Sequence, residues 1–287
     1  MPSIREHVSE VRAIELASEL KALRKVAGQT LEQVHRATGL NIGSISKMER
    51  NLITVTPRSL KALLDHYEVH GARRIALENL LTSTSGTRPW WLDYADLLEP
   101  ATVSQIALEA EAALLEEHSG NVFSLYAQVE SYARQIMANT WEVPSEDDAY
   151  LLVNVRRLRQ QRLYDTPPLA LHSIFNEAAL YSAEEPKILA EQLRHVIDLA
   201  KLGTVKFQMT PLSTGRRGLV TVNVARVSFN EAGVSSFVFS ESLGTTTVRE
   251  SELANIRFER AFARCLDASL SPDDTVAALE ARLKEIA

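Results

Sequence analysis

The stretch Gln29–Arg50, QTLEQVHRATGLNIGSISKMER, decides the fold expected of the first part of this chain. Thr30 followed by Gln33 is a capping-box pattern that opens one helix, and Asn41 is a good N-cap for the next. Gly39 lies between the two helices and tolerates the positive φ that a tight turn requires. The stretch therefore predicts a helix, a turn of four residues and a second helix.

The second of these helices is expected to bury Ile45 and Met48 and to turn its other side outward. Apolar residues at helical spacing place further helices before and after the pair. Gly28 ends the preceding helix, Thr56-Pro57 opens a following one, and Gly71 begins another. The apolar positions of the flanking helices are Leu16, Leu20, Leu23, Leu60, Leu63, Leu64 and Tyr67.

Charge is divided unevenly along the chain. Residues 1–82 carry 12 Lys and Arg against 9 Asp and Glu, whereas the remainder carries 19 against 28. Only the first part is therefore expected to face phosphates, through Lys and Arg side chains and through the backbone N–H groups of helix starts. The candidate DNA-binding residues are Thr30, Asn41, Ile42, Ser44, Ser46, Lys47, Arg50 and Arg58.

Residues 20–51 resemble the helix-turn-helix of the phage-repressor type, also called the xenobiotic-response-element (XRE) family. The resemblance implies binding to double-stranded DNA, transcription regulation and a homodimer with two reading helices about 34 Å apart. It also implies a structural pair between Arg24 and Glu49 that orients the loop at Asn51 along the DNA backbone. The matching positions are Leu23, Arg24, Gly28, Thr30, Glu32, Gly39, Ile45, Ser46, Met48 and Glu49.

Several residues depart from that family pattern. His35 replaces a usual alanine where the two helices meet, so it either widens their packing or leans outward. Leu31, Ile42 and Gly43 stand where glutamines often contact bases, and they lack the bidentate hydrogen bonds worth about 1–3 kcal/mol each. We therefore expect modest affinity from a monomer and specificity gained by dimers or a partner. The other departures are Gln29 and Thr38, and direct readout is left to Asn41, Ser44, Ser46 and Lys47.

The remainder of the chain has a different character. The small polar run TSTSGTRP predicts a linker at residues 83–89, between a helix-turn-helix domain (1–82) and a larger domain (90–287). The larger domain is expected to be α+β with an antiparallel sheet, in a chain that is mainly α. Helices are expected near 102–118, 123–139, 146–163, 186–202, 250–269 and 272–286, with β-rich runs LALHSIF, VKFQMTP, LVTVNVARVSF and SSFVFS. In LVTVNVARVSF the alternation of apolar and other residues shifts by one position after Val224. This shift predicts a bulge near Ala225-Arg226.

Residues 88–287 resemble the C-terminal domain of the WhiJ-like actinobacterial regulators. The landmarks are RPWWLDYADLL, LEAEA, QVESYARQI, NEAAL, EQLRHVIDLA, VKFQMTPLSTG and Glu241 of FSES. The chain has SLYAQV at Ser124–Val129 where that group tends to carry PGLLQT. The resemblance implies a transcription regulator with a small acidic partner protein, in an antitoxin-like pairing.

Candidate ligand- or partner-binding residues in the larger domain are few. Trp90, Trp91 and Tyr94 form either an aromatic wall for a ligand or a hydrophobic latch between the two domains. A second group of four polar or charged residues has two interpretations. These residues either line a polar pocket or belong to a solvated face or an internal ion pair. That group consists of Glu109, Tyr132, Arg134 and Glu241.

Catalytic chemistry is not expected. His172 with Glu177 and Glu241 resembles acid-base machinery, but a lone histidine on a strand is more often a satisfied core residue. No nucleophile elbow, phosphate loop or metal-ligand spacing accompanies it, so we predict no enzyme, no catalytic or metal-binding residue and no cofactor. Cys265 is expected to be a buried small hydrophobe.

Composition limits where the protein works. No apolar run approaches the roughly 20 residues that span a bilayer, and the N-terminus lacks a signal-peptide core. One cysteine allows no internal disulfide, which favours a cytoplasmic location without membrane contact. The two hypotheses are a transcription regulator whose C-terminal domain binds a protein or small ligand, and a sequestering interaction module that binds DNA weakly.

Overall fold

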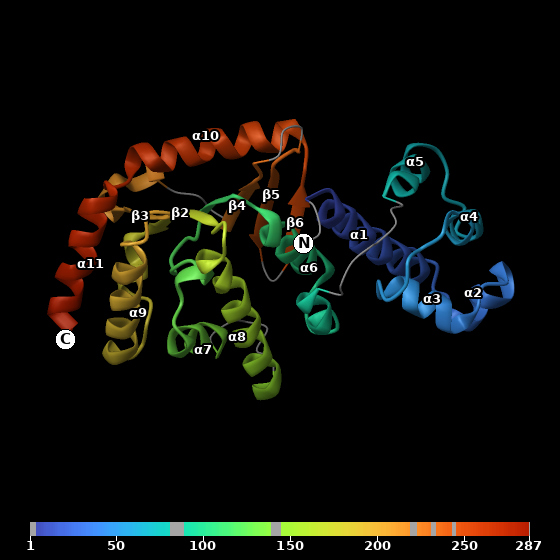
Figure 1. Ribbon diagram of the computed structural model, residues 1–287, viewed down its shortest axis with the longest axis horizontal. Helices are drawn as coiled ribbons and strands as arrows, with labels where there is room; N and C mark the ends of the chain where they lie inside the picture. Colours follow the sequence, from blue (N-terminus) through green and yellow to red (C-terminus); the bar gives the residue numbers. More distant parts are fainter. Residues whose placement is uncertain are drawn as a thin grey trace. The chain divides into compact units, whose positions relative to one another are not determined.

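The computed structural model of the protein describes residues 4–80, 89–138, 145–218, 223–230, 234–242 and 245–286. The chain divides into two compact units, residues 1–108 and 109–287, and each is considered by itself. The linker expected at residues 83–89 lies outside the described residues except for Pro89. None of the described helices is long and apolar enough to cross a membrane. Figure 1 gives the labels of the elements.

Unit 1 is helical throughout its described part. Its buried side chains come from helices that are far apart in the sequence, and Val34, Ile45 and Leu64 are fully inaccessible. The core includes Ile45 and Met48, as the sequence predicts. The helices are α1 (Ile4–Val26), α2 (Leu31–Thr38), α3 (Ile42–Glu49), α4 (Pro57–His66), α5 (Gly71–Asn79) and the short η1 (Trp90–Tyr94), and α6 (Pro100–Glu111) begins here.

The turn between α2 and α3 forms as the residues predict. Gly39 has φ 72° and ψ 2°, a left-handed conformation that glycine adopts without a steric penalty. Thr30 and Gln33 complete a reciprocal capping box at the start of α2. Asn41 caps α3 by accepting hydrogen bonds from the amides of Gly43 and Ser44. Local chemistry thus fixes the relative orientation of the two helices.

Unit 2 is built on a six-stranded sheet with the order β3-β2-β1-β4-β5-β6. β1, β2 and β3 are parallel to one another, whereas β4, β5 and β6 join them as antiparallel neighbours. The strands are β1 (Leu114–His118), β2 (Ala170–Asn176), β3 (Val205–Thr210), β4 (Asn223–Ser228), β5 (Phe237–Ser242) and β6 (Thr245–Arg249). The helices are η2 (Leu125–Ala127), α7 (Glu130–Ala138), α8 (Glu146–Gln160), η3 (Gln161–Tyr164), η4 (Glu177–Tyr181), α9 (Pro186–Leu199), η5 (Leu212–Gly218), α10 (Glu252–Ala268) and α11 (Pro272–Ile286).

The α+β class is confirmed, but half of the sheet is parallel where we expected it to be antiparallel. The reason is that α9 connects β2 to β3, since parallel strands require a crossover connection. The helix expected near 102–118 was also wrong at its end, because β1 occupies Leu114–His118. Ala, Leu and Glu in that segment favour a helix, and pairing with β2 and β4 overrides this preference.

The bulge expected at Ala225-Arg226 was wrong. Both residues keep a continuous register, with Glu117 and Glu116 on one side and Phe239 and Val238 on the other. The apolar pattern shifts phase because both faces of β4 are covered: Val224 packs with the α10 cluster, and Val227 is buried on the opposite face.

Helices cover both faces of the sheet. Figure 1 shows α10 running across the strands on one side, with α7, α8 and α9 on the other. On the α10 side, Phe258, Phe262 and Cys265 form a cluster with Ile174 and Val238. Phe175 of β2, which alternates with Ile174, contacts the ring of Phe123 in the segment before α7.

Candidate nucleic-acid interface

The outer side of α3 carries the side chains that the sequence analysis assigned to DNA contact. Lys47 and Arg50 are exposed, and so is Ile42, with 37% of its surface accessible. Ser44 and Ser46 are half-buried and flank this exposed side. α3 and its C-cap residue Arg50 therefore present two positive charges, whereas Ile42 at the start of the helix offers no hydrogen bond from its side chain.

A partly buried ion pair fixes α3 to α1. Arg24 Nε donates to Glu49 Oε1 at 2.7 Å, and Nη2 donates to Oε2 at 2.7 Å. Arg24 Nη1 also donates to the carbonyl of Gln29 at 3.2 Å, which ties in the start of α2. The hydrogen bond to Glu49 raises the pKa of Arg24. This two-pronged arrangement holds α3 in one orientation without using its outer side.

Three helix starts lie on unit 1 with their caps in place. Thr30, Asn41 and Thr56 are exposed, and each accepts a hydrogen bond from an amide in the first turn of its helix. The N3 amide of each helix is thus already satisfied, and so is that of Gly43 in α3. The remaining first-turn amides, such as those of Leu31, Ile42 and Arg58, can meet a phosphate oxygen. Arg58, the second residue of α4, is exposed beside the third start.

The residues that depart from the repressor pattern have local roles. His35 leans outward, and its Nδ1 is 2.7 Å from the carbonyl oxygen of Leu40. Thr38 donates its hydroxyl to the carbonyl of Val34 at 2.7 Å. Gln29 Oε1 is 2.6 Å from His66 Nε2 of α4. The alternative in which His35 widens the packing of α2 and α3 is therefore not what occurs.

One acidic residue that sequence reasoning missed contacts this surface. Arg50 Nη2 is 3.0 Å from Asp96 Oδ2, and both side chains remain largely exposed. Asp96 follows η1, 46 residues beyond Arg50, so no local pattern could reveal the pair. Among the described residues, Lys47 and Arg58 form no ion pair with a carboxylate. Arg50 is therefore the α3 cation that an internal acid already engages.

The aromatic group at the start of the larger domain is partly internal. Trp91 is only 4% exposed, whereas Trp90 and Tyr94 are half-buried. The ring of Trp90 meets that of Trp91 edge-on at 5.7 Å and that of Tyr94 at 6.0 Å. Packing thus accounts for Trp91, and only Trp90 and Tyr94 retain surface for a partner.

The structure does not bring Glu109, Tyr132, Arg134 and Glu241 together. Glu109 is fully buried in a bidentate pair with Arg159, at 2.7 and 2.8 Å, which is the internal ion pair among the two alternatives. Tyr132 is buried, and its hydroxyl is 2.5 Å from that of Ser182. Arg134 pairs with Glu130 at 2.7 Å, and Glu241 is exposed on β5.

The possible acid-base group is likewise dispersed. His172 Nε2 is 2.8 Å from Gln208 Oε1, and its ring meets Phe262 edge-on. Glu177 accepts the backbone N–H of Leu212 at 2.8 Å. Cys265 is buried, as predicted, and burial raises the pKa of its thiol.

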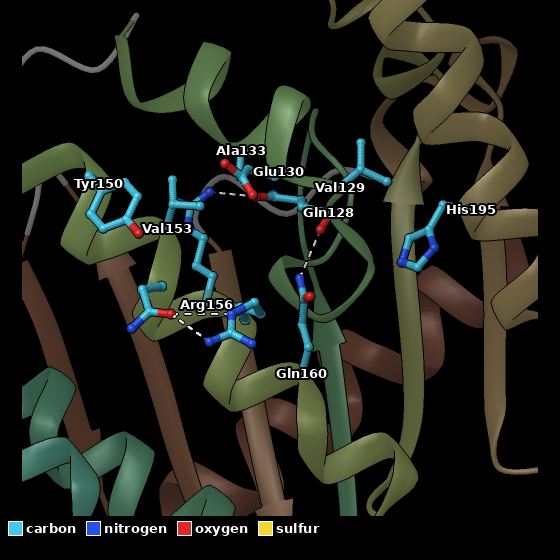
Figure 2. Close-up of a pocket in the computed structure, with 11 residues that line it drawn as sticks. Gln128, Val129, Glu130, Ala133, Tyr150, Val153, Arg156, Gln160 and His195 are labelled. Carbon is cyan, nitrogen blue, oxygen red and sulfur yellow. Dashed lines mark hydrogen bonds between the residues drawn. The ribbon is translucent and has the colours of Figure 1, made fainter. Parts of the chain in front are cut away.

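Unit 2 contains a pocket of about 410 Å³ that sequence reasoning did not find (Figure 2). It lies between the first turn of α7, the exposed side of α8 and α9. Its polar groups include the guanidinium of Arg156, the amides of Gln128 and Gln160, and the imidazole of His195. The RRLRQ run of α8 signals positive charge, but nothing in it distinguishes the two arginines that line the pocket, Arg156 and Arg157, from Arg159, which pairs with Glu109.

Comparison with known protein families gives two matches. Residues 104–281 match a family described as a domain of unknown function, DUF5753, and residues 15–77 match one described as a helix-turn-helix domain. No curated protein and no solved structure matches the chain. The second match covers α2, α3 and the Arg24–Glu49 pair.

Proposed function

We propose that this chain, which belongs to the DUF5753 family and carries a helix-turn-helix domain at its N-terminus, is a sequence-specific DNA-binding transcription regulator. One observation carries the proposal: α3 is held from behind by Arg24 and Glu49, while Lys47 and Arg50 extend from its exposed side. A helix in this position can enter a major groove with its cations near the phosphates.

The reading of bases is expected to be weak for a single chain. Ile42 and Gly43 offer at most a contact with a thymine methyl group, so the hydrogen bonds to bases are left to Asn41, Ser44, Ser46 and Lys47. A homodimer that places two α3 helices about 34 Å apart would add the contributions of two half-sites. This arrangement, like membership of the XRE type and of the WhiJ-like actinobacterial regulators, rests on resemblance.

The second unit is proposed to bind a partner protein or ligand that modulates DNA occupancy. A basic stripe supports a small acidic partner: Arg257, Arg260 and Arg264 are exposed along one side of α10 and form no ion pair among the described residues. Leu253 and Ile256 are exposed on the same side, with 55% and 36% of their surface accessible. An acidic helix with apolar anchors would complement this stripe.

The same stripe favours the second candidate function, in which the chain chiefly sequesters a partner and binds DNA weakly. Salt dependence separates the two candidates. For a DNA-binding regulator, log affinity falls linearly with log salt, with a slope of about −0.9 for each phosphate contact. A sequestering module would show little such dependence on any recovered DNA.

The experiment begins with DNA recovered with the native full-length chain. Affinity is measured by fluorescence anisotropy over a range of salt concentrations, for the wild type and for Lys47→Ala/Arg50→Ala. The double variant should bind every sequence more weakly and lower the salt slope by about 2. Lys61→Ala/Arg73→Ala is a matched control, because both residues are exposed in unit 1 and already paired with Asp65 and Glu19. Unchanged affinity in the α3 double variant would exclude this docking face.

A further inference from the structure

We propose that the pocket between α7, α8 and α9 binds a small organic anion, whose carboxylate or phosphate is received by the guanidinium of Arg156. The inference rests on the proposed function in one respect, because it names the ligand class that would regulate DNA occupancy. The site itself is defined within unit 2, and its binding can be measured in the absence of DNA.

The pocket has the size and composition of a ligand site. Its volume of about 410 Å³ lies within the range of roughly 300–1,000 Å³ that is usual for small-molecule sites. Figure 2 shows Arg156 directed towards the side chain of Gln128, with Gln160 below this segment and His195 on its other side. The lining residues are Gln128, Val129, Glu130, Ala133, Tyr150, Val153, Asn154, Arg156, Arg157, Gln160 and His195.

Arg156 lacks a carboxylate partner among the described residues. It is half-buried, and its hydrogen bond goes from Nη1 to Oε1 of Gln128, a neutral amide. Arg159, one helical turn further along α8, is buried too, but it holds Glu109 in a bidentate pair. Two arginines of one helix thus enter the interior, and only one of them is neutralised by the protein itself.

Electrostatics at Arg156 agrees with this geometry. Burial, together with the charge of Arg159, lowers the pKa of Arg156 to about 10. The carboxylate of Glu241 acts in the opposite direction but does not offset these effects. A partly desolvated cation without sufficient compensation is costly, and an incoming anion would remove that cost.

The surroundings hold the guanidinium ready for an oxyanion. The side chain of Gln128 is held in place by a hydrogen bond, in which its Nε2 donates to the carbonyl of Phe123 at 2.7 Å. Gln160 Nε2 donates to the carbonyls of Leu125 and Gln128, at 2.7 and 2.9 Å. Because the side chains of Gln128 and Gln160 are already held by these hydrogen bonds, ligand binding would order few further side chains. A guanidinium can meet a carboxylate or phosphate with two parallel hydrogen bonds.

The remaining lining indicates what the rest of the ligand is like. Val129, Ala133 and Val153 give the pocket an apolar wall, and the ring of Tyr150 lies at its edge. The one carboxylate of the lining, that of Glu130, is paired with Arg134 at 2.7 Å and so repels an anion less. An organic acid or phosphate ester with an apolar or aromatic body fits this combination better than a bare inorganic ion.

The test uses the full-length chain without DNA and three probes of similar shape: benzoate, phenyl phosphate and the neutral benzyl alcohol. Thermal denaturation and calorimetric titration at millimolar probe concentrations should show that at least one anion binds and raises Tm, while benzyl alcohol does neither. Comparing benzoate with phenyl phosphate identifies which oxyanion the site prefers. Arg156→Gln should weaken anion binding at least tenfold. Arg249→Gln, which removes an exposed arginine of β6 that does not line the pocket, should leave it unchanged.

Stability separates a ligand-binding arginine from a structural one. Arg156→Gln should leave the unliganded Tm unchanged or higher, because it removes a charge that no described carboxylate neutralises. If that variant fails to fold, Arg156→Lys is used instead. It keeps the positive charge but removes the two parallel N–H donors of the guanidinium, so it should still weaken anion binding about tenfold. Absence of anion binding by the wild type, or equal binding by the Arg156 variants, would overturn the proposal. If Lys47→Ala/Arg50→Ala still binds the anion but no longer binds DNA, then the anion site of unit 2 is independent of the DNA-binding side of α3. The two proposals can therefore fail separately.

Discussion

Arg24 and Glu49 are joined by two hydrogen bonds of 2.7 Å each, although 25 residues separate them in the chain. The carboxylate of Glu49 has only 6% of its side-chain surface exposed, so it depends on Arg24 for its charge compensation. Glu49→Gln should therefore destabilise unit 1 by roughly 3 kcal/mol, since it leaves a guanidinium without its partner in a largely buried position. Urea denaturation of the full chain, followed by circular dichroism, measures the loss.

An exposed ion pair of the same unit provides the control. Lys61→Ala breaks the contact between Lys61 and Asp65, both on the surface of α4, and should cost at most about 0.5 kcal/mol. The double variant Arg24→Met/Glu49→Leu should recover much of the lost stability, because it leaves no buried charge. Equal losses in Glu49→Gln and Lys61→Ala would contradict the role assigned to the buried pair.

The helix-turn-helix could be predicted from the sequence because its determinants are local. Thr30, Asn41 and Gly39 each act within a few residues of their own position, and the structure contains the caps and the left-handed turn that they predict. Contacts between distant segments were not predictable in this way. Asp96 reaches Arg50 across 46 residues, and Glu109 reaches Arg159 across 50.

The pocket was missed for the same reason. In the α8 sequence, Arg156 and Arg159 look alike, and their difference comes from Glu109, which lies on another helix. Likewise β1 consists of residues that favour a helix, and only its neighbours in the sheet make it a strand. The position of a charge along a helix predicts its outward or inward side, whereas its partner is decided by the tertiary fold.

Asn41 combines a structural and an electrostatic role that two substitutions can separate. Its Oδ1 accepts the amides of Gly43 at 2.8 Å and Ser44 at 3.3 Å. Asn41→Ala should cost about 1 kcal/mol of stability through loss of the cap. Asn41→Asp keeps the cap and places a negative charge where a phosphate would approach, so stability should hold while DNA affinity falls. If Asn41→Asp binds DNA as tightly as the wild type, the start of α3 does not face the backbone.

The contact between Arg50 and Asp96 should weaken DNA binding, because an internal carboxylate competes with phosphate for the same guanidinium. Asp96→Asn should raise DNA affinity by about 1.4- to fivefold at low salt, which corresponds to the roughly 0.2–1 kcal/mol of an exposed pair. The gain should shrink as salt screens the charges. Asp93→Asn makes the same change of charge three residues earlier and serves as the control. An equal gain from both variants would point to net charge rather than to this contact.

Glu117 of β1 gives a prediction about pH. Its side chain is buried, and within the described part of the chain its Oε1 has no hydrogen-bond partner. Burial raises the pKa of this carboxyl above its ordinary value of 4.5, which the hydroxyls of Ser124 and Ser173 oppose without reversing. The folded state thus binds the proton more tightly than the unfolded state does, so ionisation reduces stability as pH rises above 4.5. Glu117→Gln should be more stable than the wild type at pH 7, by about 1.4 kcal/mol for each unit by which the pKa is raised.

The advantage of Glu117→Gln should disappear below pH 4.5, where the carboxyl is protonated in both states, and thermal denaturation across this range measures it. Glu116, its neighbour on β1, is the matched control with the opposite expected sign. Its carboxylate is held by Arg226, at 3.0 Å from Nε, in a pair that is half-buried. Glu116→Gln should therefore lower stability at pH 7, by roughly 1.5–3 kcal/mol for a hydrogen bond to a charged group. A loss of stability in both variants at pH 7 would mean that Glu117, like Glu116, has its charge compensated within the fold.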